Sequence, residues 1–119
     1  MTETLNNKQF DLEERAFNFA KKVFDYVNAL PKTITNVEIG KQLTRSAGSL
    51  GANYIEANES LGKKDFIMRI KISRKEAKES RYWLNLSTPD SKNVKIQQDL
   101  VRESTELMNI FGAILNKSQ

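Results

Sequence analysis

The chain has 119 residues and a mass of 13.6 kDa, with 19 Lys and Arg against 15 Asp and Glu, a net charge of +4 and a pI near 9.4. This length predicts one domain over residues 1–119, since single domains cluster at about 100–150 residues. The absence of cysteine and histidine excludes disulfides, thiolate or imidazole metal sites, and Cys or His nucleophiles, including a Ser-His-Asp triad.

The first ten residues are polar and include Glu3, so they lack the basic start and apolar run of a signal peptide. The longest charge-free stretches, 46–55 and 107–116, have ten residues each, whereas a membrane-spanning helix needs about 18–20. We therefore expect a cytoplasmic protein that does not enter membranes.

The first predicted helix covers about residues 10–30 and ends at Pro31. Its apolar residues recur every three or four positions, as on one face of an α-helix. The expected inward stripe is Phe17, Ala20, Phe24, Val27 and Leu30, with Phe10, Ala16 and Val23 beside it.

The second predicted helix covers residues 36–59. Thr35 and Glu38 have the spacing of a capping box, which would begin the helix there. The expected inward residues are Ile39, Leu43, Ala47, Leu50, Tyr54 and Ala57. The segment 46–52 consists almost entirely of small residues, and this favours close helix packing over a phosphate-binding loop, because no Gly-Lys-Ser/Thr signature follows Gly51.

The third and fourth predicted helices cover residues 63–87 and 92–116, with the last turn at residues 88–91. The third helix would turn inward Phe66, Ile70, Ser73, Ala77, Ser80 and Leu84. The fourth would turn inward Ile96, Leu100, Ser104, Leu107, Phe111 and Ile114. Four helices of similar length with short connections predict an all-α fold, an antiparallel up-down-up-down four-helix bundle.

Catalytic chemistry has little support in this composition. Metal sites in four-helix bundles use inward Glu residues with Glu-x-x-His pairs, and the chain has no histidine. It also has no Asp-x-Asp cluster for a divalent ion. We expect no catalytic residues, no metal, no cofactor and no enzymatic activity.

Positive charge is concentrated on the third helix. Residues 63–87 hold eight Lys and Arg against three Asp and Glu, a net +5, whereas the whole chain carries +4. Lys64, Lys71, Lys75 and Lys78 share one helix face and span about 21 Å, which matches several phosphates of a nucleic acid. The alternative is a solvated lysine-rich surface that serves solubility.

The other candidates on this helix have two interpretations each. Arg69, Arg74 and Arg81 lie closer to the apolar side, so they would contact phosphates or form ion pairs between helices. Tyr82 continues the lysine face and would stack on a base or pack at a rim. Trp83 lies at the flank of the core and would fill a groove between helices or a contact between subunits.

Several of these segments together resemble a known family. They are Arg45–Asn53 (RSAGSLGAN), Glu56-Ala57, Lys64–Ile67 (KDFI) and Lys75–Leu84 (KEAKESRYWL). The chain resembles the four-helix-bundle proteins encoded within 23S rRNA intervening sequences, a superfamily that includes the accessory variability determinants of diversity-generating retroelements. The resemblance extends from about Phe10 to Leu115.

This resemblance implies homopentamers of short antiparallel bundles. It also implies that the retroelement members are basic and bind nucleic acid together with a reverse transcriptase. We therefore expect a non-enzymatic, oligomeric protein that binds RNA or DNA without sequence specificity through Lys64, Lys71, Lys75, Lys78, Arg69, Arg74 and Arg81. The alternative is a structural or adaptor protein whose basic helix docks a protein partner and binds no nucleic acid.

Overall fold

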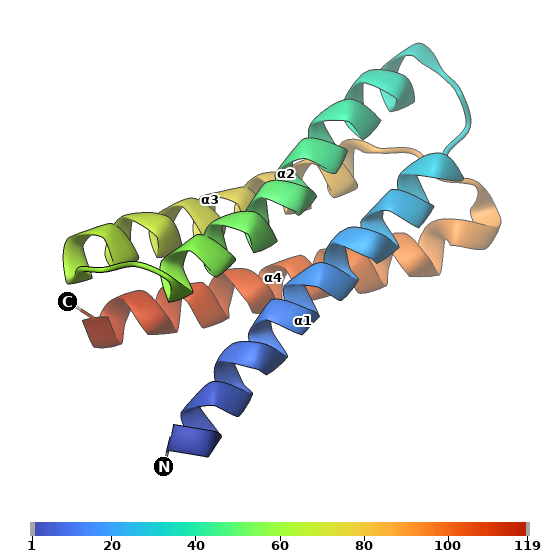
Figure 1. The fold of residues 1–119 in the computed structure, drawn as a ribbon. Coiled ribbons are helices and arrows are strands. Elements are labelled where there is room, and N and C mark those ends of the chain that lie inside the picture. The colour runs from blue at the N-terminus through green and yellow to red at the C-terminus, as the bar shows by residue number, and fades with distance from the viewer. Residues whose placement is uncertain (1, 119) are drawn as a thin grey trace.

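Four long helices form an elongated bundle in this computed structural model, which describes the backbone of residues 2–118 and the side chains of residues 11–118. They are α1 (Thr2–Asn28), α2 (Ile34–Asn58), α3 (Lys63–Leu86) and α4 (Val94–Ser118), and a short 3-10 turn, η1 (Ser91–Asn93), precedes α4. Consecutive helices run in opposite directions, and the N-terminal half of α1 diverges from the other three (Figure 1). The predicted all-α four-helix bundle is confirmed.

The helix boundaries differ from the prediction mainly at the start of α1. This helix begins at Thr2, eight residues earlier than expected, so the polar N-terminal segment continues the helix. The last helix begins at Val94 rather than about Lys92, because η1 occupies the intervening positions. The predicted bounds of the third helix hold to within one residue.

The buried stripe of α1 is not the one predicted. Phe17 was expected to face inward, yet 63% of its surface is exposed. Leu30, just after the helix, is buried as predicted, and Phe10 lies outside the residues whose side chains are described. Within residues 11–28, the buried apolar residues are Leu12, Ala16, Phe19, Val23 and Tyr26, of which Ala16 and Val23 were expected beside the stripe. These residues also recur every three or four positions, and they lie next to the predicted stripe on the helix surface. Ala20, Phe24 and Val27 flank them and are partly buried, so both stripes are apolar and the packing partners α2 and α4 decide which is central.

The core of α2, α3 and α4 follows the predicted stripes closely. The fully or nearly fully buried members are Leu43, Ala47, Leu50, Tyr54, Ala57, Ile70, Ser73, Ala77, Ser80, Leu84, Leu100, Ser104, Leu107 and Phe111. Ile39, Phe66 and Ile114 are partly buried. Ile96 was placed inward wrongly: it remains 45% exposed in the first turn of α4, at the edge of a depression between α1 and α4.

The small residues of α2 bring it close to α1, as expected. A Cβ atom at Gly51 would lie 3.4 Å from the Cβ of Ala16, and one at Gly48 would lie 4.0 Å from the ring of Phe24. The short side chains therefore allow the two helix surfaces to meet, and segment 46–52 is helical packing surface rather than a phosphate loop.

The N-terminus of α2 is capped two residues earlier than predicted. Thr33 is the capping residue, and its hydroxyl accepts a hydrogen bond of 3.1 Å from the backbone N–H of Asn36. Thr35, the expected cap, lies within the first helical turn. Asn36 is buried and explains the shift, since its amide donates to the carbonyls of Pro31 and Thr88 and accepts from the N–H of Thr88. This side chain links the α1–α2 connection to the segment that follows α3.

Candidate nucleic-acid interface

A groove of about 550 Å³ runs between α3 and α4, and basic side chains form one of its walls. The lining residues from α3 are Lys71, Arg74, Lys75, Lys78 and Arg81. Those from α4 are Met108, Leu115 and Asn116. We call this feature the basic groove. It brings together five of the seven predicted site residues. The prediction placed all seven on one helix and did not include a groove.

The spacing of these cations explains why they occur together. Lys71, Lys75 and Lys78 are separated by four and three residues, so they lie above one another on the exposed face of α3. Arg74 and Arg81 are seven residues apart, two turns along the side of α3 that borders α4. Lys64 lies two turns before Lys71, outside the groove, in a shallow depression with Ile67 and Met68.

Nearby acidic side chains are paired away from the basic groove. Glu103 and Glu106 of α4 bind Arg15 of α1, with N–O distances of 2.7 and 3.0 Å. On α3, Glu76 and Glu79 bind the guanidinium of Arg45 on α2, at 3.0 and 3.1 Å.

As a result, no described carboxylate neutralises the cations of the basic groove. No ion pair within residues 11–118 includes any of its five basic side chains. Its lining also contains no carboxylate from the described residues. Clustered unpaired cations create a positive potential that attracts an anionic ligand.

The three arginines of the prediction have different surroundings. Arg69 is half-buried on the opposite flank of α3, where it donates a hydrogen bond of 3.0 Å to the side-chain oxygen of Asn53 on α2. It therefore lies apart from the basic groove. Arg81 donates a long hydrogen bond, 3.4 Å, to the hydroxyl of Thr105, and Arg74 extends beside Gly112. Among the described residues, none of the three arginines forms an ion pair with another helix, so that alternative is not observed.

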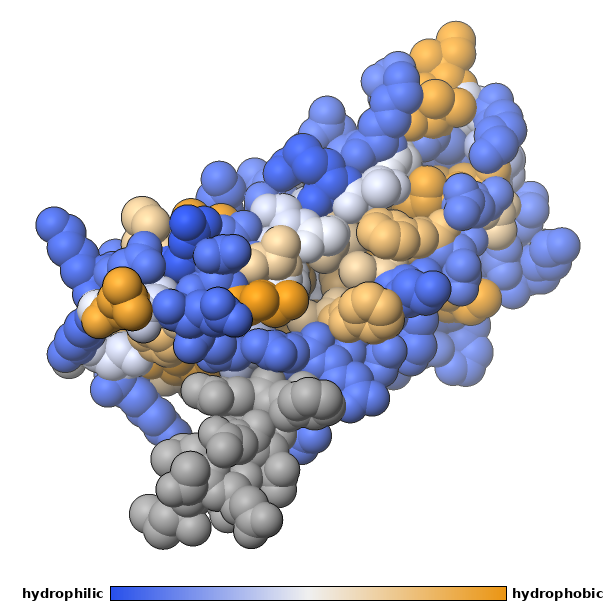
Figure 2. Space-filling model, viewed as in Figure 1, coloured by the Kyte–Doolittle hydropathy of each residue, from blue (hydrophilic) through white to orange (hydrophobic). Residues whose placement is uncertain are grey.

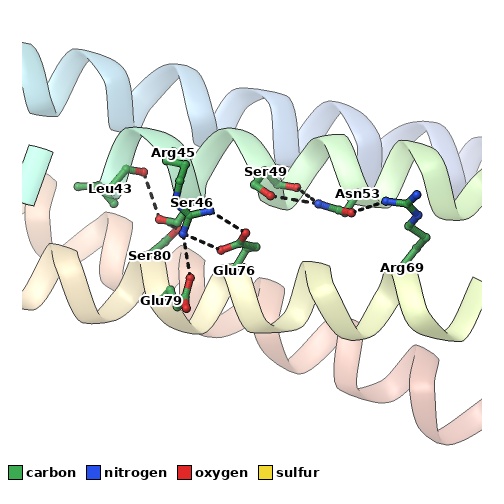
Figure 3. Close-up of polar contacts among 9 residues, drawn as sticks. All are labelled: Leu43, Arg45, Ser46, Ser49, Asn53, Arg69, Glu76, Glu79 and Ser80. Atoms are coloured by element: carbon green, nitrogen blue, oxygen red, sulfur yellow. Dashed lines mark hydrogen bonds and ion pairs between the residues drawn. The ribbon is translucent and has the colours of Figure 1, made fainter. Parts of the chain in front are cut away.

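A polar layer between α2 and α3 is the main feature that the sequence patterns did not predict (Figure 3). Arg45 reaches across to Glu76 and Glu79, and the hydroxyls of Ser46 and Ser80 share a hydrogen bond of 2.8 Å. Glu76 is only 4% exposed. Burial is the largest single effect and opposes its ionisation, but hydrogen bonding with Arg45, Glu79 and Ser49 and the charge of Arg45 together outweigh it and hold the pKa of Glu76 below its ordinary value.

This polar layer is a closed structural contact rather than a reactive site. Each carboxylate in it already accepts hydrogen bonds from a cation, so neither is available as a free acid or base. The sequence contains one signal that could have indicated this layer. Glu76 and Glu79 are three residues apart, which places both on the flank of α3 away from Arg74 and Arg81.

Two aromatic residues lie at the end of the cationic row. Tyr82 is 59% exposed, and its ring meets that of Trp83 edge to face, with centroids 5.1 Å apart. Trp83 is partly buried and packs against the core, as one of its two predicted roles required.

The part of the chain that the structure describes contains neither a group of residues that could bind a metal ion nor a helix that could span a membrane. No group of three or more acidic side chains suitable for a metal ion occurs there. None of the helices within residues 2–118 is both long enough and apolar enough to cross a bilayer.

Comparison with known proteins places this geometry in a family. A crystal structure from Bacteroides thetaiotaomicron VPI-5482, described as a protein with unknown function from the S23 ribosomal protein family, has the same fold with a TM-score of 0.76. It is 26% identical in sequence, and the match covers 92% of this chain and 98% of that one. No curated protein matches the chain significantly. The family model of the 23S rRNA-intervening sequence protein matches residues 8–116, and the chain therefore belongs to that family.

Proposed function

We propose that this protein is a non-enzymatic, oligomeric helical bundle that binds RNA or DNA through backbone phosphates with little sequence preference. The observation that carries the proposal is the basic groove, where five adjacent cations form no ion pair among the described residues while neighbouring carboxylates bind cations elsewhere. Phosphate contacts supply affinity that depends on charge and not on base sequence.

The cations of the groove differ in what they offer a phosphate. Lys71, Lys75 and Lys78 are exposed, so their ammonium groups can follow successive phosphates as mobile point charges. Arg74 and Arg81 sit against α4 and present planar guanidinium groups, which bind a phosphate through two parallel hydrogen bonds. Lys64 extends the row by two turns and would contact a longer ligand.

Self-association is the second part of the proposal. Apolar side chains are exposed where α2 begins, at the upper right of the view in Figure 2. The exposed apolar residues of this region include Ile34, at 87% exposure, and Val37, at 41%. Exposed apolar patches are typical of contacts between subunits. The family resemblance implies a homopentamer, in which five basic grooves would act on one polyanion and increase its avidity.

Charge reversal at Lys71 and Lys75 tests the nucleic-acid proposal. The Lys71→Glu, Lys75→Glu double variant removes two phosphate contacts and adds two repulsions, so we expect binding at 50 mM salt to weaken at least about tenfold. The loss should be equal for two RNA strands of unrelated sequence, measured by fluorescence anisotropy. For the wild type, affinity for these single strands should fall by up to about 130-fold between 50 and 200 mM salt if all five cations contact phosphates.

The matched control changes the same number of charges elsewhere. Lys21 on α1 and Lys32 in the α1–α2 connection are exposed, and a Lys21→Glu, Lys32→Glu variant should bind within about threefold of wild type. Undetectable binding by the wild type, or affinity that ignores ionic strength, would contradict the proposal. A protein that purifies free of nucleic acid but retains a polypeptide, such as a reverse transcriptase, would favour the adaptor function instead.

A further inference from the structure

We infer that the basic groove takes a single strand in preference to a duplex, and that Tyr82 stacks on one of its bases. This inference rests on the proposed function and adds the ligand class and a residue outside the groove lining. Its basis is the position of an exposed aromatic ring in the cationic row, together with the apolar side chains of the groove.

The row of exposed cations on α3 continues directly into Tyr82. Lys71, Lys75, Lys78 and Tyr82 are separated by four, three and four residues, so all four lie on one face along about 16 Å of helix. Tyr82 is 59% exposed, which is unusual for a large aromatic side chain on a face otherwise formed by lysines. A strand whose phosphates follow the lysines would bring a base to this ring.

The ring of Tyr82 is held in place by its neighbour. It meets Trp83 edge to face at an interplanar angle of 70°, and Trp83 itself packs against the buried core. We expect this contact to restrict the rotation of Tyr82 before any ligand arrives. Stacking then orders little that was mobile, and this favours binding.

The α4 side of the groove suits unpaired bases. Partly buried Met108 provides apolar surface opposite the cations, above buried Leu115, and exposed Asn116 adds a hydrogen-bonding group. A single strand can direct phosphates to the lysines and bases to apolar or aromatic surfaces. A duplex keeps its bases stacked inside and would leave both Tyr82 and the apolar side of the groove without contacts.

The experiment compares a 12-nucleotide RNA strand with a 12-base-pair RNA duplex by fluorescence anisotropy at 50 mM salt, using the full chain. We expect the wild type to bind the single strand more tightly at equal phosphate concentration. Tyr82→Ala should weaken single-strand binding about tenfold, the typical effect of losing one stacked base, and leave duplex binding within twofold. Tyr82→Phe keeps the ring and should bind as wild type does.

Two further measurements separate stacking from other roles. Phe17 of α1 is 63% exposed and offers a matched aromatic control, so Phe17→Ala should leave both affinities unchanged. Trp83 is the only tryptophan of the chain, and a base stacked on Tyr82 should change its fluorescence on adding the single strand but not the duplex.

Each failure has its own signature. Equal or tighter binding of the duplex, or a Tyr82→Ala variant that binds the single strand like wild type, overturns the inference while the charge-reversal result upholds the basic groove. A Tyr82→Ala variant with an altered mass in native mass spectrometry and unaltered affinity makes Tyr82 a subunit contact and also overturns it. Absence of binding to either RNA overturns the inference and the proposed function together.

Discussion

Glu76 is the only charged residue that is buried among residues 11–118, and Arg45 is the cation that pairs with it there. The side chain of Arg45 is itself 53% exposed, so water hydrates the guanidinium but has little access to the carboxylate of Glu76. Removing a partner of a buried charge costs more than removing an exposed pair, because the remaining group loses both its hydration and its hydrogen bonds.

The pH dependence of stability should therefore report on Glu76. Its pKa lies below the ordinary 4.5 in the folded protein, so its ionised form stabilises the fold above that pH, and this contribution is lost as the pH falls through the folded value. We expect Glu76→Gln to lower the free energy of unfolding by about 1–2 kcal/mol at pH 7, and by less at pH 3. Urea unfolding followed by circular dichroism measures both.

A surface carboxylate provides the comparison for Glu76. Glu38 pairs with Lys41 at 3.5 Å, and both side chains are more than 65% exposed. Glu38→Gln should change the free energy of unfolding by less than about 0.5 kcal/mol at either pH. A cost for Glu76→Gln that is equally small, or that does not change between pH 7 and 3, would show that Arg45 does not hold this carboxylate ionised.

At the scale of the helices, α2 shows how a tertiary contact selects one capping residue over another. Thr33 and Thr35 both belong to the residue type that caps helices, and the latter also has Glu38 at the right distance for a capping box. Asn36 decides between them, because its buried amide must lie beside Pro31 and Thr88. The helix then begins where its N–H meets Thr33.

Two threonine substitutions test which cap operates. Thr33→Ala should lower the stability by about 1 kcal/mol, since the N–H of Asn36 loses its acceptor. That loss corresponds to a fall of about 4 °C in the thermal midpoint. Thr35→Ala should leave the midpoint unchanged or slightly raised, because alanine is the better helix former. A larger fall for Thr35→Ala than for Thr33→Ala would show that the capping box predicted at Thr35 operates instead.

For the whole molecule, the arrangement of helices separates the charges of the chain into different surfaces. The ion pairs between α1 and α4 and between α2 and α3 use acidic side chains, whereas the α3–α4 boundary retains cations without partners in the described residues. An excess of only +4 thus becomes a localised positive groove. Copies of the chain that assemble would add such grooves without any new type of contact.

Assembly should be visible in the salt dependence of binding. One groove with five cations gives a slope of about −3.5 in a plot of log affinity against log salt for a single strand. A 30-nucleotide strand that reaches several grooves should give a steeper slope than a 6-nucleotide strand. Native mass spectrometry should show a multiple of 13.6 kDa. A monomeric mass with equal slopes for both strands would contradict self-association.

Much of the fold could be predicted because its signals are local. Periods of three and four residues identified every helix and the buried faces of α2, α3 and α4, and the excess of Lys and Arg on α3 identified the basic element. The absence of cysteine and histidine also excludes whole classes of chemistry by composition alone, because no arrangement of the chain can supply a thiolate or an imidazole.

The rest depended on which helices lie next to each other. Two adjacent apolar stripes on α1 fit the same period, so only contact with α2 and α4 made Phe19 buried and Phe17 exposed. Likewise, composition gives the number of carboxylates but not their partners. The fold directs Glu76 and Glu103 to Arg45 and Arg15, and Lys71 and Lys75 beside α4 form no ion pair within residues 11–118. Periodicity and charge are properties of a segment, whereas burial and pairing are properties of the space between segments.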